Sequence, residues 1–301
     1  MGAREGLMLE FLQYLVLGLL VGGVYALAAS GLTLVFGVMR IINIAHGAFL
    51  ILGAFLAFTA WSKLGIDPML AIILIAPVSF ALGWVIYKVA IAPVRTAPMA
   101  STVLLTFGLA LVIEATMGVI WGNNATSMTP AYGSQSFSIG SFYMPKAQVF
   151  GGVVAVAVLL VLGLILTRTW LGRAIRAAAN NPTGAELVGI KIESVSAVVF
   201  GLGMAAACTG GAIVGVLYSF VPGTHYMWIA RLLAIVVLGG LGSLNGAIVG
   251  AVLFGLAETF TSAYISSAWA TAFPYLIVFA VLLLRPQGLM GVRRREDASA
   301  L

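Results

Sequence analysis

A long apolar stretch with a polar interruption opens the sequence: residues 11–55 read FLQYLVLGLLVGGVYALAASGLTLVFGVMRIINIAHGAFLILGAF. Residues 9–36 exceed the roughly 20 apolar residues that cross a bilayer. They also exceed the apolar part of a signal peptide, which has about 7–15 residues, so we interpret them as a retained first helix. Asn43 and His46, with Gly47, then interrupt the apolar sequence. The stretch therefore predicts one membrane helix and a break before the second.

Composition extends this interpretation to the whole chain of 301 residues. Hydrophobic residues make up 62% of it and charged residues 8%, whereas soluble domains are about half apolar and a quarter charged. A membrane β-barrel would show alternating segments of about ten residues instead of long apolar runs. We therefore predict an all-α, polytopic transmembrane helical bundle that forms a single domain over residues 1–301. About eight membrane segments are expected, at 9–36, 42–61, 69–92, 100–121, 148–167, 195–220, 230–263 and 268–285.

Basic residues predict the orientation of the chain in the membrane. Short loops rich in Lys and Arg stay in the cytoplasm, which places the insertion 168–191 and the three arginines at 293–295 there. The insertion 122–146, with its single lysine, and residues 221–230 are then external. The net charge of +6 consists of such topology signals, so we expect a lipid bilayer and no nucleic acid as partner.

A cluster of helix breakers, GGLGSLNG at 239–246, interrupts the apolar run 230–263. If this run crossed the membrane once, the C-terminal arginines would lie outside, so we expect it to enter and leave on the same side. Interrupted or re-entrant half-helices are thus predicted near 40–50 and 230–246. Irregular backbone is tolerated at membrane depth only where protein or a water-filled cavity covers it.

Similar sequences at the two breaks predict an internal repeat. His46-Gly47-Ala48 and Asn245-Gly246-Ala247 each begin an apolar run, and many transporters consist of repeats whose broken helices form the binding site. The domain then divides into a first half of about 1–121, an external loop at 122–146 and a second half of about 147–301.

Polar residues at the breaks are candidates to line a transport path. Asn43 and His46 lie three residues apart and would share one face of a helix. They either contact a solute or satisfy the freed backbone of a broken helix, and the sequence leaves both alternatives open. The candidate set also includes Gly47 at the first break and Gly242, Ser243 and Asn245 at the second.

Two carboxylates inside apolar segments, Glu114 and Glu258, extend this candidate set. Carboxylates within membrane segments are costly and mark functional sites by default. Alternatively, Glu114 reaches the membrane interface and Glu258 pairs with a neighbouring helix or subunit. Arg40 and Arg231 stand at the entrances of the two interrupted segments. Either could meet an anionic carboxylate, but we expect them to extend towards lipid headgroups.

The insertion 168–191 carries the strongest local signal, in GRAIRAAANNPTGAELVGIK at 172–191. Asn181 followed by Pro182 is typical of a helix N-terminus, and Gly189 suits a helix end. The insertion is therefore predicted to form two short helices. These either dock on a cytoplasmic partner or lie on the anionic leaflet as an amphipathic helix.

Motifs for catalysis do not occur in the sequence. The nearest run to a phosphate-binding loop, Gly184 to Lys191, has Ile190 where that motif requires lysine. One cysteine and two histidines argue against a metal site. We therefore expect no enzymatic activity, metal or cofactor in this chain. Its function would instead be transport or scaffolding.

Four stretches in order resemble the LivH-type inner-membrane permeases of bacterial branched-chain amino-acid ABC importers. They are residues 11–55, RTWLGRAIRAAANNPTGAELVGI, GGLGSLNGAIVGAVLFGLAE and LLRPQGLMG. These stretches are distributed along nearly the whole chain. Ile44 departs from the phenylalanine that is more frequent in this family, and residues 122–146 show the least family character.

The resemblance implies a permease subunit that forms the path for branched-chain or other hydrophobic amino acids, or a related small amphipathic solute. Its partners would be a second, LivM-like permease rather than a second copy, two ATPase subunits that carry ATP and magnesium, and a periplasmic solute-binding protein. The insertion 168–191 would couple the permease to the ATPases through Arg173, Arg176, Asn181, Pro182, Glu186 and Gly189. The alternative is an ion-coupled secondary transporter or a channel-like facilitator that uses Glu114 or Glu258.

Overall fold

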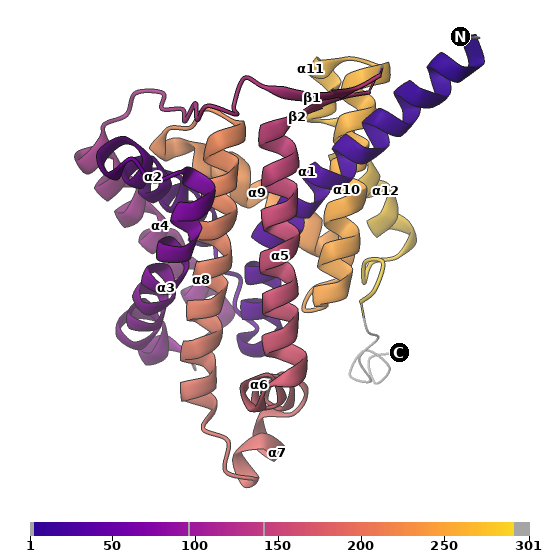
Figure 1. The fold of residues 1–301 in the computed structure, drawn as a ribbon. Helices are drawn as coiled ribbons and strands as arrows, with labels where there is room; N and C mark the ends of the chain where they lie inside the picture. The colour runs from indigo at the N-terminus through magenta and orange to yellow at the C-terminus, as the bar shows by residue number, and fades with distance from the viewer. Residues whose placement is uncertain (1–2, 96, 141, 292–301) are drawn as a thin grey trace.

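The computed structural model describes residues 3–95, 97–140 and 142–291, which form a bundle of helices (Figure 1). Eight helical stretches in the described part are long and apolar enough to cross a membrane, which confirms the predicted all-α polytopic fold. The arginines at 293–295 lie outside the described residues. The elements are α1 (Ala3–Met39), α2 (His46–Leu64), α3 (Pro68–Ile86), α4 (Met99–Trp121), β1 (Ser136–Ile139), β2 (Phe142–Pro145), α5 (Lys146–Arg168), α6 (Trp170–Asn180), α7 (Pro182–Leu187), α8 (Ile192–Leu217), α9 (His225–Gly239), α10 (Leu244–Tyr264), α11 (Ser267–Ala270) and α12 (Phe273–Leu284).

The two ends of the bundle differ (Figure 1). At one end, the projection end, α6 and α7 extend beyond the other helices. At the other, the hairpin end, the antiparallel strands β1 and β2 lie near the start of α1. The insertions 122–146 and 168–191 therefore lie at opposite ends of the bundle, as their predicted orientation requires.

Small residues let the central helices approach one another closely. A Cβ on Gly211 of α8 would overlap the carbonyl oxygen of Leu50 in α2, and a Cβ on Gly53 of α2 would overlap the backbone of Cys208 in α8. On the other side of the core, a Cβ on Gly22 of α1 would lie 2.8 Å from the Cα of Val252 in α10. Membrane helices commonly associate through such small-residue contacts, so these crossings account for some of the 36 glycines in the chain.

The predicted break after α1 is present at residues 40–45. α2 begins at His46, whose Nε2 lies 2.9 Å from the carbonyl oxygen of Ala28, about three helical turns before the end of α1. The chain therefore returns deep into the bundle before α2 starts. The amide of Ile44 donates to Thr106 Oγ1 of α4 at 3.2 Å, so protein satisfies part of the irregular backbone.

A second break of the same kind follows α8, where residues 218–224 lead to α9 at His225. Shifting the sequence by 179 positions aligns His46 with His225, Gly22 with Gly201 and Gly31 with Gly210. α1 and α8 run in opposite directions, and α1 packs on α10 as α8 packs on α3. These relations define an inverted-topology repeat, an arrangement common among transporters.

The register predicted for this repeat was wrong. It paired His46 with Asn245, but Asn245 lies in the first turn of α10 at the projection end. The two tripeptides looked alike because each opens a helix after a glycine-rich or irregular segment. Of the segments before His225 and before Asn245, it is the one before His225 that follows a long central helix and enters the depth of the bundle, as the break before His46 does.

The chain runs along α9 to the projection end and returns along α10 to the hairpin end (Figure 1). This segment therefore enters and leaves on the same side of the bundle, as the predicted orientation of the C-terminus requires. Its turn contains Gly240 and Gly242, with φ of 106° and 83°, which is backbone that glycine adopts readily. A Cβ on Gly37, near the end of α1, would lie 3.3 Å from the oxygen of Gly242, so the turn lies at the projection end and not at mid-depth. Residues 225–229, predicted to belong to an external loop, are instead the start of α9.

Candidate functional site

The starts of the two broken helices meet inside the bundle. A Cβ on Gly47 would lie 2.6 Å from the carbonyl oxygen of His225, so the first turns of α2 and α9 are in direct contact. Both His46 and His225 are completely buried. Because a carbonyl only accepts, His46 donates from Nε2 to Ala28, which ties α2 to α1. This contact places one predicted path residue, His46, at the joint between three central helices.

Asn43 lies in the irregular segment before α2 and is buried. Its Oδ1 has no hydrogen-bond partner among the described residues, and the same is true of Nδ1 in both His46 and His225. Buried polar atoms normally have partners in protein or ordered water. The two breaks therefore bring polar groups with unused hydrogen-bonding capacity into one region of the bundle.

A carboxylate on α4 lies next to the start of α9. Glu114 Oε2 accepts from His225 Nε2 at 3.1 Å and from the hydroxyl of Tyr226 at 2.8 Å. The two donor rings lie next to each other, with their centroids 4.0 Å apart and their planes tilted by 35°. The side chain of Glu114 is 27% exposed, whereas His225 is inaccessible. We call Glu114, His225 and Tyr226 the α4–α9 cluster.

Sequence reasoning missed His225 and Tyr226. The only available signals were that His225 is one of two histidines in the chain and follows Pro222-Gly223-Thr224, a turn sequence at an apolar boundary. Its partner, Glu114, lies 111 positions away, and no local pattern links the two residues.

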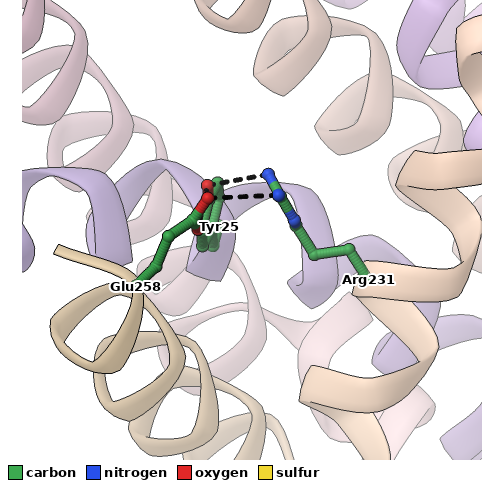
Figure 2. A network of polar contacts seen from close by, with 3 residues as sticks. All are labelled: Tyr25, Arg231 and Glu258. Carbon is green, nitrogen blue, oxygen red and sulfur yellow. Dashed lines mark hydrogen bonds and ion pairs between the residues drawn. The ribbon is translucent and has the colours of Figure 1, made fainter. Parts of the chain in front are cut away.

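A second polar network joins α1, α9 and α10 (Figure 2). Arg231 Nη2 lies 3.1 Å from Glu258 Oε1, and its Nη1 donates to Tyr25 Oη at 2.8 Å. Tyr25 in turn donates to Glu258 Oε2 at 2.7 Å. The guanidinium carbon also lies 4.9 Å from the ring centroid of Trp228, a distance typical of cation–π contacts.

This network corrects the expectation for Arg231. The arginine was expected to extend to a lipid headgroup, but it is 5% exposed. A buried guanidinium needs an anion, and Glu258 supplies it from the next helix. Glu258, a predicted path residue, is therefore the counter-ion of Arg231 and keeps 19% of its side chain exposed.

A cavity of about 710 Å³ opens at the projection end. It brings Arg40, from the end of α1, together with Gly242 and Ser243 of the α9–α10 turn. Ser243 also caps α10, because its Oγ accepts from the amide of Gly246 at 3.1 Å. The predicted path residues thus lie in separate places: near the start of α2, in the α4–α9 cluster, in the Arg231 network and at this cavity.

The predicted pair of short helices in 168–191 is present as α6 and α7. Asn181 Oδ1 accepts from the amide of Gly184 at 2.9 Å and caps α7, with Pro182 as its first residue. Gly189 ends the turn after α7 with φ of 85°. Arg176 donates to the carbonyl oxygen of Leu166 near the end of α5, so it fixes the junction of α5 and α6. Arg173 is exposed.

Residues 14–284 match the family described as branched-chain amino acid transport system / permease component. The chain is 30% identical to the high-affinity branched-chain amino acid transport system permease protein LivH of Salmonella typhimurium, over 94% of this chain and 96% of that protein. It is 30% identical to BraD, the corresponding permease protein of Pseudomonas aeruginosa, with the same coverage.

A probable branched-chain amino acid transport permease protein LivH of Methanocaldococcus jannaschii is 29% identical over 88% of each chain. No solved structure matches the chain. The family match extends from α1 to the end of α12 and includes both breaks and the α6–α7 projection. This chain therefore belongs to the permease components of branched-chain amino acid transport systems.

Proposed function

We propose that this chain forms one half of the membrane path of an ATP-driven importer for branched-chain amino acids. The observation that carries the proposal is the α6–α7 projection in a chain of this permease family. Energy would come from two separate ATPase subunits, which would bind ATP and magnesium outside this chain. A second, LivM-like permease would complete the path, and a periplasmic binding protein would deliver the solute at the hairpin end of a bacterial inner-membrane complex.

The shape of the projection supports docking to a partner rather than lying on a lipid leaflet. The apolar face of α6, with Ala174, Ile175 and Ala178, is buried against the bundle. An amphipathic helix on a membrane surface would instead need that face to enter the lipid. At the end of α7, Leu187 and Val188 are 85% and 75% exposed. An anchored projection with an apolar tip fits a groove on another protein.

Charged and capping residues frame this tip. Arg173 on α6 and Glu186 on α7 are exposed, and both would contact the ATPase. Asn181, Pro182 and Gly189 would act indirectly, because they define the ends of α7. Arg176 would also act indirectly, through its bond to the end of α5.

The path itself would run along the two broken helices. Asn43, His46 and Gly47, which are buried where the broken helices meet, would support the wall of its middle. The cavity at Gly242 and Ser243 would form its exit at the projection end. Asn245 would hold the turn beside that exit. Such interrupted helices form solute sites in many transporters with inverted repeats.

The positions of the two carboxylates disfavour the ion-coupled alternative. A proton- or sodium-coupled carrier needs a carboxylate that is free to bind the ion at depth. Glu258 is occupied by Arg231 and Tyr25, and Glu114 lies only about two turns from the end of α4 at Trp121.

Charge reversal at the projection tests the docking step. We expect Arg173→Glu to weaken binding of the ATPase about tenfold, equivalent to about 1.4 kcal/mol, because a rim charge of the interface changes sign. The measurement is titration of the purified permease pair with the ATPase subunit, together with the rate of ATP hydrolysis. Lys63→Glu, an equally exposed charge reversal at the end of α2, is the control and should bind normally. Unchanged ATPase binding by the Arg173 variant would contradict the assigned role of the projection.

A further inference from the structure

We infer that Glu114 is a site on the transport path that receives the ammonium group of the amino acid, with His225 and Tyr226 as positioning residues. The inference rests on the proposed function, since it assumes that amino acids pass along this chain. It assigns a chemical task to the α4–α9 cluster beyond the general permease role.

The exposure of Glu114 indicates that lipid does not cover it. Glu114 lies about two turns before the end of α4 at Trp121, and its side chain is 27% exposed. A carboxylate facing hydrocarbon costs several kcal/mol, so such groups face protein or a water-filled cavity. This part of α4 therefore faces a polar space in the assembled transporter.

The hydrogen bonds of Glu114 leave one of its oxygens free. Both donors of the cluster, His225 and Tyr226, bind Oε2, and no described residue donates to Oε1. Oε1 lies on the side of Gly223, where an added Cβ would be 3.4 Å from it. One oxygen is thus held by two donors, and the other has no donor among the described residues.

Glu114 and Glu258 also differ in whether a Lys or Arg balances the negative charge. Glu258 forms an ion pair with Arg231, whereas no Lys or Arg in the described part of the chain bonds to Glu114. A carboxylate in a membrane segment that is bonded only to a histidine and a tyrosine can still accept a cation. An ammonium group, with three donors around a compact charge, suits a single open carboxylate oxygen.

An apolar groove on the same helix suits the rest of such a solute. Phe107, Val103 and Leu104 of α4 line this groove together with Ile42 and Ile44 of the irregular segment before α2. Phe107 lies about two turns from Glu114, towards the projection end. An aliphatic amino acid released from the carboxylate would therefore next meet an apolar surface that continues along the first break.

The test is uptake of radiolabelled L-leucine by liposomes that contain the complete importer, with the binding protein saturated. Glu114→Gln removes the charge and keeps the shape, and we expect at least a tenfold lower uptake rate with ATPase stimulation within twofold of the wild type. Glu114→Asp, which keeps the charge, should recover part of the uptake. Thr116→Val is the matched control, because Thr116 is exposed on the same helix and bonds only to the backbone of Val112.

Two outcomes would overturn the inference. Normal uptake by Glu114→Gln would show that the charge is not needed on the path. Loss of the second permease, or loss of ATPase stimulation in parallel with uptake, would assign Glu114 to subunit assembly. Failure of the proposed function is distinguishable, because then the wild-type complex itself would not take up leucine.

Discussion

Replacing Gly211 by alanine is expected to leave little correctly folded protein. Gly211 lies where α8 crosses α2, and a Cβ there would overlap the carbonyl oxygen of Leu50 and lie 3.2 Å from the amide nitrogen of Ala54. These atoms are backbone, so relief requires two central helices to separate. Overpacking costs about 1–3 kcal/mol and occasionally more, and we expect the upper end of that range.

The measurement is the thermal unfolding midpoint of the detergent-purified chain, with the monodisperse fraction from size-exclusion chromatography. Gly163→Ala is the control, because nothing lies within 4 Å of a Cβ on that glycine of α5. Alanine is about 1 kcal/mol better than glycine inside a helix, so this control should be as stable as the wild type or more stable. A Gly211 variant that melted like the control would show that α2 and α8 do not cross as closely as described.

Replacing Arg231 by methionine is expected to destabilise the fold by a similar or larger amount. The substitution leaves the Glu258 carboxylate without its cation inside the bundle (Figure 2). Removing one partner of a buried ion pair costs about 3–5 kcal/mol. Because Glu258 keeps 19% of its side chain exposed, we expect a loss near the lower bound. The lost contacts with Tyr25 and Trp228 add to it.

A double-mutant cycle separates this ion pair from simple packing. Arg231→Met with Glu258→Met removes both charges, and replacing a whole buried pair by apolar groups is often neutral or stabilising. The double variant should therefore unfold at a higher temperature than Arg231→Met alone. If it is as unstable as the single variant, the stabilisation comes from packing and not from the pair. Leucine uptake by a folded double variant then reports whether Glu258 has any further role on the path.

Local features of the site were predictable from sequence because their causes lie within a few residues. The helix start at Asn181-Pro182 depends on one side chain that caps an amide three positions away. The break near His46 is visible as polar residues and a glycine inside an apolar run. The number of membrane segments follows from hydropathy alone, since a bilayer sets the length of a helix.

Contacts between distant helices were not predictable in the same way. Glu258 and Tyr25 are separated by 233 positions, and neither carries a local mark that identifies its partner. Arg231 was misassigned for this reason, because an arginine near a segment end looks the same whether it reaches a headgroup or a buried carboxylate. The repeat was misregistered because three-residue similarity ignores which helices are long and central.

The inverted repeat gives a structural reason for the position of the proposed path. Each half contributes one long helix, one irregular break and one shorter helix that begins with a buried histidine. The two shorter helices, α2 and α9, touch at Gly47 and His225. Repeats related in this way can shift against each other around a fixed site, which is what alternating exposure of a solute to the two sides requires.

The most direct measurement of the central claim is leucine uptake by liposomes that hold this chain, a second permease and the ATPase subunits, with ATP enclosed and the binding protein outside. We predict uptake that requires the enclosed ATP, is abolished by enclosed vanadate and is unaffected by a protonophore. Uptake that continued down its gradient without ATP, or that collapsed with the protonophore while ATP remained, would contradict an ATP-driven permease.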